Sequence, residues 1–378
     1  MFSNMADLKN FLALLSSKLN VQECDATKAK CLFSVWLQIR NKQTITQLLM
    51  QNRQRFMRIT ERAKQYMIAA VLVIALQTQT AKAQTDADAI MMAKNNFCVG
   101  AMYGYNSWKN YWEGTYKRSA LNLGTVSSQM VSAMGDYGIT SRLNLLFGAP
   151  YVKTKASAGT MRGTEGIQDL SLWLKWMALE KKIGKKTVYA VYGVGGFSTP
   201  LSNYEGDYLP LALGLHTTTF SGRVIADIQH GDFFATASGT YTLRNNITIN
   251  RDAYYTTSMH YTNEVDMPDM VSAQFRTGYR TNRWIAEALF DYNNTIGGFD
   301  IRKNDMPFPS NNMDWTSLGV NVKYNIKKVP GLSLVGGGNY VLHGRNVGQS
   351  TMFNGGVFYI FHTSKTAATS HSCKLCAK

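Results

Sequence analysis

The stretch WTSLGVNVKYNI (residues 315–326) alternates apolar and polar side chains with a period of two. A strand places successive side chains on opposite faces, so this period predicts a β-strand between an apolar and a polar environment. The stretches DLSLWLKWMA (residues 169–178) and RWIAEALFDYN (residues 283–293) alternate in the same way. One face of the first stretch carries Thr316, Leu318, Val320, Val322, Tyr324 and Ile326; the other carries Trp315, Ser317, Gly319, Asn321, Lys323 and Asn325.

Comparable alternation along the chain predicts twelve strands, joined by connections that are short and long in turn. The strands are expected near 97–107, 120–134, 138–152, 167–179, 187–199, 211–229, 233–245, 269–281, 283–296, 314–326, 332–343 and 351–362. Short turns are expected at 135–137, 180–186, 230–232, 282 and 327–331, and longer connections at 108–119, 153–166, 200–210, 246–268, 297–313 and 344–350.

The lengths of these strands separate two all-β architectures. Strands of a soluble β-sandwich average ~5–6 residues, whereas a tilted strand needs ~9–11 residues to cross a bilayer. Most of the expected strands exceed ten residues, and an outer-membrane barrel has an even strand number, short periplasmic turns and long external loops. The sequence therefore predicts an antiparallel transmembrane β-barrel of about twelve strands in the lipid bilayer of the outer membrane. Aromatic residues near strand ends would meet the membrane interfaces: Tyr151, Trp284, Tyr324 and Phe361.

The longest apolar stretch of the chain, at residues 67–76, lies inside MIAAVLVIALQTQTAKAQ (residues 67–84). It is too short for a membrane-spanning helix, which needs ~20 residues. Basic residues precede it and a small-x-small site follows, so we expect a signal peptide at 57–83, cleaved between Ala83 and Gln84, in a Gram-negative bacterium. Residues 1–56 then read as upstream sequence from a wrong start, or alternatively as a small helical extension. We expect a periplasmic segment at 84–96, the barrel at 97–362 and a tail at 363–378.

Charge and cysteine content exclude some classes of protein. The formal net charge is +16, but after residue 83 the 28 Lys and Arg and 20 Asp and Glu are scattered singly, which does not favour nucleic-acid binding. Cys373 and Cys376 form one Cys-x-x-Cys in the tail, a weak candidate for a metal site without a second pair. Cys98 reads as a small apolar side chain of the first strand. We expect no cofactor.

The segments YGITSRLNLLFGAPYVK (residues 137–153) and GTEGIQDLSLWLKWMAL (residues 163–179) resemble outer-membrane proteins of the MetA-pathway of phenol degradation family. The resemblance covers about 45 residues, and Gln168 departs from it where a small residue is usual. It implies a barrel that passes small, often aromatic or apolar, molecules, and it brings no catalytic residues. The residues that carry it are Tyr137, Gly138, Ile139, Thr140, Pro150, Gly166, Asp169, Leu170 and Lys175.

The polar faces of the strands carry charges that we expect in the lumen. Arg276 and Arg280 should flank Glu287 on the neighbouring strand. Such charges either fill a narrow barrel as a structural network or form a constriction that selects what passes. The six histidines are scattered, so we expect no enzyme. The candidate lumen residues are Arg142, Asp169, Lys175, Arg223, Asp227, Arg276, Arg280, Glu287, Asp291 and Lys323.

Overall fold

The computed structural model describes residues 85–120, 122–303 and 305–362. The expected signal peptide, its cleavage site at Ala83 and Gln84, and the tail with Cys373 and Cys376 lie outside these residues. No helix in the described part of the chain is long and apolar enough to cross a membrane.

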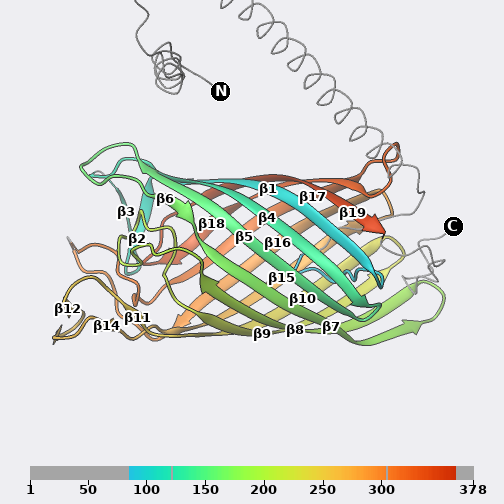
Figure 1. Ribbon diagram of the computed structural model, residues 1–378, viewed down its shortest axis with the longest axis horizontal. Helices are drawn as coiled ribbons and strands as arrows, with labels where there is room; N and C mark the ends of the chain where they lie inside the picture. The colour runs from blue at the N-terminus through green and yellow to red at the C-terminus, as the bar shows by residue number, and fades with distance from the viewer. Residues whose placement is uncertain (1–84, 121, 304, 363–378) are drawn as a thin grey trace, which may run out of the picture. The chain divides into compact units, whose positions relative to one another are not determined.

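Twelve long strands close into one antiparallel barrel, as the sequence predicted (Figure 1). Each long strand pairs with the long strand that follows it in the chain, and β1 closes the barrel against β19. The long strands are β1 (Asn96–Trp108), β4 (Val126–Thr140), β5 (Leu143–Ala156), β7 (Asp169–Ile183), β8 (Thr187–Pro200), β9 (Thr219–His230), β10 (Phe233–Arg244), β15 (Asp269–Arg280), β16 (Trp284–Ile296), β17 (Asp314–Asn325), β18 (Leu332–Arg345) and β19 (Thr351–His362).

The two faces of β17 show how the alternation sorts side chains. Val320 is 62% exposed on the outer face, whereas Ser317 and Lys323 on the inner face are buried. Leu174 of β7, Ala288 of β16 and Val322 of β17 also face outward and are exposed, as expected. A continuous apolar outer wall is what a hydrocarbon environment requires, since lipid cannot hydrogen-bond to polar side chains. The wall is therefore that of a transmembrane barrel.

Three expected boundaries were wrong. The turn expected at 135–137 is absent, because β4 continues to Thr140 and turns at 141–142. Its glycines allow close approach instead of a turn: a Cβ on Gly135 would lie 2.3 Å from the Phe147 ring, and one on Gly138 would lie 2.2 Å from the Ala93 carbonyl oxygen. At the other end β4 begins at residue 126 rather than 120, and β9 begins at residue 219 rather than 211.

The long connections gather at one end of the barrel and contain short strands that the sequence did not predict (Figure 1). Residues from three of these connections share a small core around Val265, Tyr254 and Phe308. The short strands are β2 (Asn110–Glu113), β3 (Tyr116–Ser119), β6 (Glu165–Ile167), β11 (Ile247–Thr248), β12 (Tyr254–Tyr255), β13 (Met259–His260) and β14 (Glu264–Val265). We call this the long-loop end and the opposite end the short-turn end.

An ion pair ties two connections of the long-loop end together. Arg345 Nε lies 2.7 Å from Asp300 Oδ1, and the hydrogen bond from Arg345 lowers the pKa of the Asp300 carboxyl group. Asn346 donates to the same carboxylate at 2.8 Å and accepts from the backbone amide of Gly114 at 2.8 Å. These contacts join the connections after β1, β16 and β18.

Candidate lumen site

Residues 85–94, which we call the lumenal segment, lie against the inner wall of the barrel. The backbone carbonyl of Ala89 accepts a hydrogen bond from the Tyr192 hydroxyl of β8 at 3.0 Å. Ile90 packs with Phe234 of β10 and Ile285 of β16. A segment that contacts inward-facing residues of β8, β10 and β16 lies inside the lumen. We expected residues 84–96 to be a periplasmic segment, and residues 85–94 correct that expectation.

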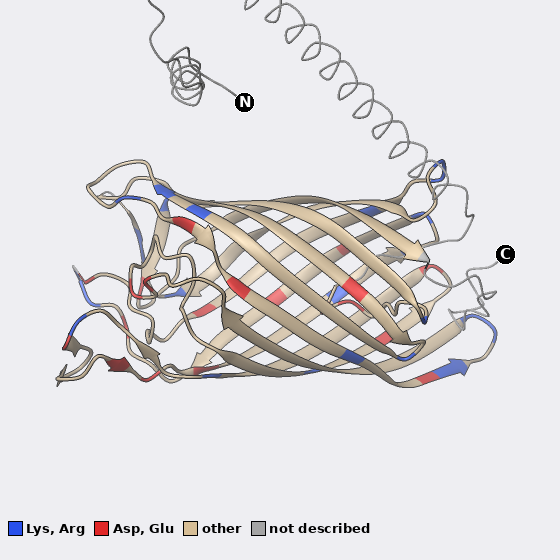
Figure 2. Cartoon of the chain, in the orientation of Figure 1, with Lys and Arg blue, Asp and Glu red and all other residues tan. Residues whose placement is uncertain are grey.

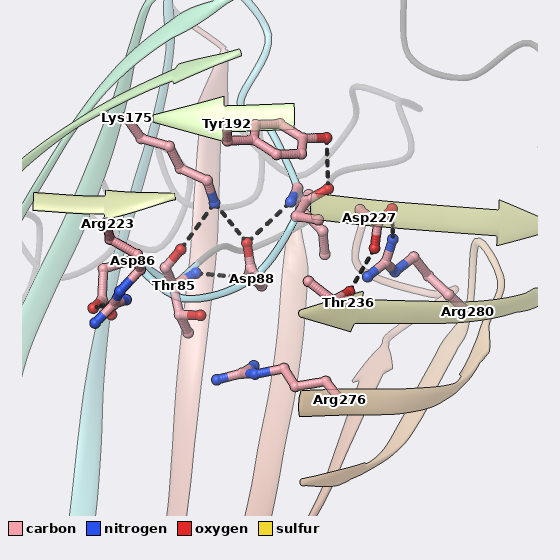
Figure 3. Close-up of polar contacts among 12 residues, drawn as sticks. Thr85, Asp86, Asp88, Lys175, Tyr192, Arg223, Asp227, Thr236, Arg276 and Arg280 are labelled. Carbon is pink, nitrogen blue, oxygen red and sulfur yellow. Dashed lines mark hydrogen bonds and ion pairs between the residues drawn. The ribbon is translucent and has the colours of Figure 1, made fainter. Parts of the chain in front are cut away.

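Asp88 anchors the lumenal segment to Lys175 of β7 (Figure 3). The Lys175 ammonium donates to Asp88 Oδ1 at 2.9 Å and to the backbone carbonyl of Thr85 at 3.1 Å, and its side chain is 0% exposed. Asp88 also accepts from the backbone amides of Thr85 at 2.7 Å and Ile90 at 3.1 Å. A buried charge needs a partner and further hydrogen bonds; here the two side chains are each other's partner, and backbone groups of Thr85 and Ile90 supply the further bonds.

A second carboxylate of the segment, Asp86, binds Arg223 of β9. Arg223 Nη1 lies 2.7 Å from Asp86 Oδ2, while Arg223 Nε donates to the Thr240 hydroxyl of β10 at 2.8 Å. The two side chains of this ion pair are 21% and 25% exposed, so water competes with it more than with the Lys175–Asp88 pair. The segment is thus held to the wall by two ion pairs. The Lys175–Asp88 pair is buried, and the Arg223–Asp86 pair is partly exposed to water.

Beside the segment, the charge of Arg280 on β15 is neutralised by a carboxylate of the barrel wall. Its Nη1 donates to Asp227 Oδ2 of β9 at 3.2 Å, and its guanidinium lies 3.8 Å from the centre of the Phe234 ring. The Thr236 hydroxyl donates to the other oxygen of Asp227. Arg280 flanks Glu287 in the strand register, as expected, since Gly278 pairs with Glu287, but the carboxylate that Arg280 binds is Asp227 on β9.

Arg276 of β15 does bind Glu287 of β16, as expected. Arg276 Nη1 lies 3.1 Å from Glu287 Oε1, and both side chains are 10% exposed. Arg276 Nε donates to Gln274 at 2.5 Å, and the Gln274 amide donates in turn to Asp291. These four side chains form a continuous chain of contacts along two neighbouring strands.

The remaining candidate residues separate into three environments. Lys323 is buried on the inner face of β17. Asp169 lies at the long-loop end of β7 and accepts a 2.5 Å hydrogen bond from Tyr204; burial and this hydrogen bond raise the pKa of the Tyr204 hydroxyl. Arg142 is exposed in the turn after β4, not in the lumen, because that strand extends further than expected. Figure 2 shows charged residues in the loops at both ends of the barrel and also on several strands between them.

Three lumen features were missed from the sequence. Asp86 and Asp88 belong to DADAIMMA (residues 86–93), where two acidic residues precede apolar ones, and this stretch begins two residues after the expected cleavage site. Asp136 is 2% exposed on the inner face of β4. The inner wall also carries large apolar side chains, including Trp173 and Ile225, so it is not the wholly polar face that alternation implied.

Among the described residues, no group of three or more His, Cys, Asp or Glu side chains could hold a metal ion. His260 bonds the Thr256 hydroxyl at 2.8 Å and stacks on Tyr254, and His230 bonds the Thr187 hydroxyl at 2.8 Å. These histidines therefore act as local structural contacts of loops and turns.

Replacing Glu287 with Gln should destabilise the barrel. The substitution leaves the Arg276 guanidinium without a charge partner where both side chains are nearly buried, and breaking such a pair costs about 3–5 kcal/mol. The temperature at which the folded band disappears on semi-native gels should fall. The double variant Arg276→Gln with Glu287→Gln is the control, because it removes both charges, and it should recover part of the loss. If both the stability of the barrel and its preference for anions over cations in conductance measurements were unchanged, Glu287 would face neither a network nor a pore.

The closed wall, the apolar outer surface and the charged lumen define an antiparallel transmembrane β-barrel of twelve strands. An outer-membrane channel from Pseudomonas putida F1 has a similar structure, with a TM-score of 0.56 and 15% sequence identity, covering 74% of this chain and 100% of that one. Less similar are KdgM porin, with a TM-score of 0.36, 7% identity and coverage of 70% and 99%, and OprD from Pseudomonas aeruginosa, with 0.33, 10%, 74% and 97%. No family model and no curated protein matches the chain.

Proposed function

We propose that the chain is an outer-membrane channel through which small aromatic or apolar molecules diffuse passively. The observation that carries this proposal is a closed barrel whose lumen holds the ten residues 85–94, which precede β1. The lumenal segment is held to the wall by two ion pairs and belongs to no strand. It can therefore leave the lumen without breaking any strand pairing. The alternation of short turns and long loops favours the short-turn end as the periplasmic one.

The lining of the lumen supports solutes that are apolar or aromatic. Trp173, Tyr192 and Phe234 face inward among the charges, and Ile225 is buried beside them. Binding sites for small molecules combine apolar and aromatic walls with a few polar groups that orient the ligand. The fold similarity to the Pseudomonas putida channel and the resemblance of residues 137–153 and 163–179 to the MetA-pathway family support the same function.

Uptake by intact cells tests the proposed solute class. Cells with the chain should take up phenol at low concentration faster than cells in which its gene is deleted. The outer membrane is the barrier to be crossed in both strains. Restoring the gene should restore the rate. Equal uptake with and without the chain would argue against phenol-like solutes.

The proposal requires export, which places the mature terminus near the lumenal segment. We expect cleavage between Ala83 and Gln84, so that the mature chain begins two residues before Asp86. Intact-mass measurement of protein extracted from outer membranes should then find a chain that starts at Gln84. A chain that still begins at Met1 would contradict both the signal peptide and the outer-membrane location.

A barrel with a permanently filled lumen, serving a structural or ligand-binding role, is the second candidate. The complete burial of Lys175 and Ile225 next to the lumenal segment favours it, since such contacts resist hydration. The two candidates differ in what happens when the segment is released. A channel then conducts ions, and a filled structural barrel loses stability without conducting.

A further inference from the structure

We propose that Lys175 and Arg223 form a binding site for solutes that combine a carboxylate with an apolar body, and that the lumenal segment occupies this site as a tethered competitor. This inference rests on the proposed channel function, because a solute reaches these residues only through the lumen. It names the class of solute that the lumen binds most tightly.

The charges of the wall supply the first part of the argument. Arg276 and Arg280 have wall carboxylates as partners, Glu287 and Asp227. Within the described residues, the ion pairs of Lys175 and Arg223 are made instead with the segment, through Asp88 and Asp86. When the segment leaves the lumen, two cationic groups therefore lose their ion-pair partners. Asp136 on β4 lies close enough to Lys175 for their charges to interact, but the two side chains form no ion pair among the described residues.

The geometry of the contacts shows what kind of anion fits. Asp88 presents one oxygen to the Lys175 ammonium at 2.9 Å, and Asp86 presents one to the Arg223 guanidinium at 2.7 Å (Figure 3). Both ligands are carboxylates, and Arg is suited to planar carboxylate recognition. Two backbone carbonyls of the segment, at Thr85 and Ala89, accept further hydrogen bonds from Lys175 and Tyr192. The segment therefore shows a carboxylate-bearing peptide in the site.

The surroundings require the rest of the ligand to be apolar. Ala89 of the segment is buried in a cluster that includes Ile225, Tyr192 and Val194, with Trp173 packed against it. The Tyr192 ring also lies 5.8 Å from the Lys175 ammonium. A solute that replaces Asp88 and Ala89 would place its carboxylate on Lys175 and its apolar body against these side chains. Benzoate is the simplest probe with this combination of groups.

The test compares the full chain with a variant that lacks residues 85–91, in which Met92 and the contacts of β1 are kept. Calorimetric titration of the detergent-solubilised deletion variant should show benzoate binding at least about tenfold tighter than in the wild type, because the competing segment is gone. Benzyl alcohol, which lacks the carboxylate, should bind weakly to both. The full-length Asp86→Asn/Asp88→Asn variant should also gain affinity, which guards against misfolding of the deletion variant.

Substitutions in the wall complete the test. In the deletion variant, Lys175→Met and Arg223→Gln should each weaken benzoate binding about tenfold, whereas Lys153→Gln on the outer face should not. Benzoate affinity that is equal to that of benzyl alcohol, or independent of Lys175 and Arg223, would overturn the inference even if the variant conducts ions. Tight benzoate binding by a variant that does not conduct would keep the site and overturn the channel.

Discussion

Asp88→Asn is expected to raise the released fraction of the lumenal segment by about two to four orders of magnitude. The Lys175 ammonium is fully buried, and Asp88 is its charged partner. Removing one partner of a buried pair costs about 3–5 kcal/mol, and each 1.4 kcal/mol is a factor of about ten in an equilibrium constant. The ammonium can regain solvation when the segment withdraws and water enters, so the cost falls mainly on the docked state.

The released fraction can be read from the reactivity of a cysteine at position 89. Ala89 is 6% exposed, so Ala89→Cys should react with a thiol reagent only after the segment withdraws. The reporter requires a background in which the cysteines outside the described residues are replaced by serine: Cys24, Cys31, Cys373 and Cys376. Labelling should then accelerate in proportion to the released fraction.

Two control variants separate the effect of breaking the buried Lys175–Asp88 pair from the effect of losing a negative charge in general. Asp86→Asn breaks the partly exposed ion pair with Arg223, which should stabilise the docked segment by only about 0–1 kcal/mol. Labelling should therefore accelerate less than about tenfold. Adding Lys175→Met to Asp88→Asn removes the buried ammonium and should slow labelling again. Equal labelling of the Asp88→Asn and parent chains would mean that this pair does not hold the segment.

Val320→Arg should destabilise the inserted barrel by about 2–4 kcal/mol, the cost of a cation near the bilayer midplane. Val320 lies in the middle of β17 and is 62% exposed on the outer face. The control is Asn339→Arg, on the inner face of β18, where Asn339 pairs with Gly319 beside Val320. A cation there faces the lumen and should cost far less.

Unfolding by urea in lipid vesicles measures this difference. The Val320 variant should unfold at lower urea concentration than the parent chain and the Asn339 variant. If both arginines had equal effects, the assignment of outer and inner faces would be wrong for these strands.

The wall of the barrel could be predicted from the sequence because each strand is marked by a local alternation of apolar and polar residues. In residues 315–326 the period of two already separates the lipid face from the inner face, and β17 keeps that separation. The strand prediction failed at two glycines, because glycine is common both in turns and at positions where neighbouring groups approach closely. Gly135 and Gly138 resemble turn residues, but they lie in β4 because Phe147 and Ala93 approach too closely for a larger side chain.

The lumen could be predicted only in part, because its contacts join residues far apart in the chain. Arg276 and Glu287 lie on strands that a short turn connects, so their pairing followed from the strand register. Asp88 and Lys175 are separated by 87 residues, and nothing in the local pattern of either points to the other. Residues 85–94 have no long periodic pattern, so the sequence alone did not show that they enter the barrel.

Single-channel recording of the Asp88→Asn variant in planar bilayers tests the central claim most directly, which is that the lumen is a passage closed by residues 85–94. The parent chain should conduct in rare, brief openings, and the variant should show the same unitary conductance with a much higher open fraction. A variant whose Ala89→Cys reporter labels rapidly, yet which conducts no ions, would contradict the claim: the segment would be released and the barrel would still be closed.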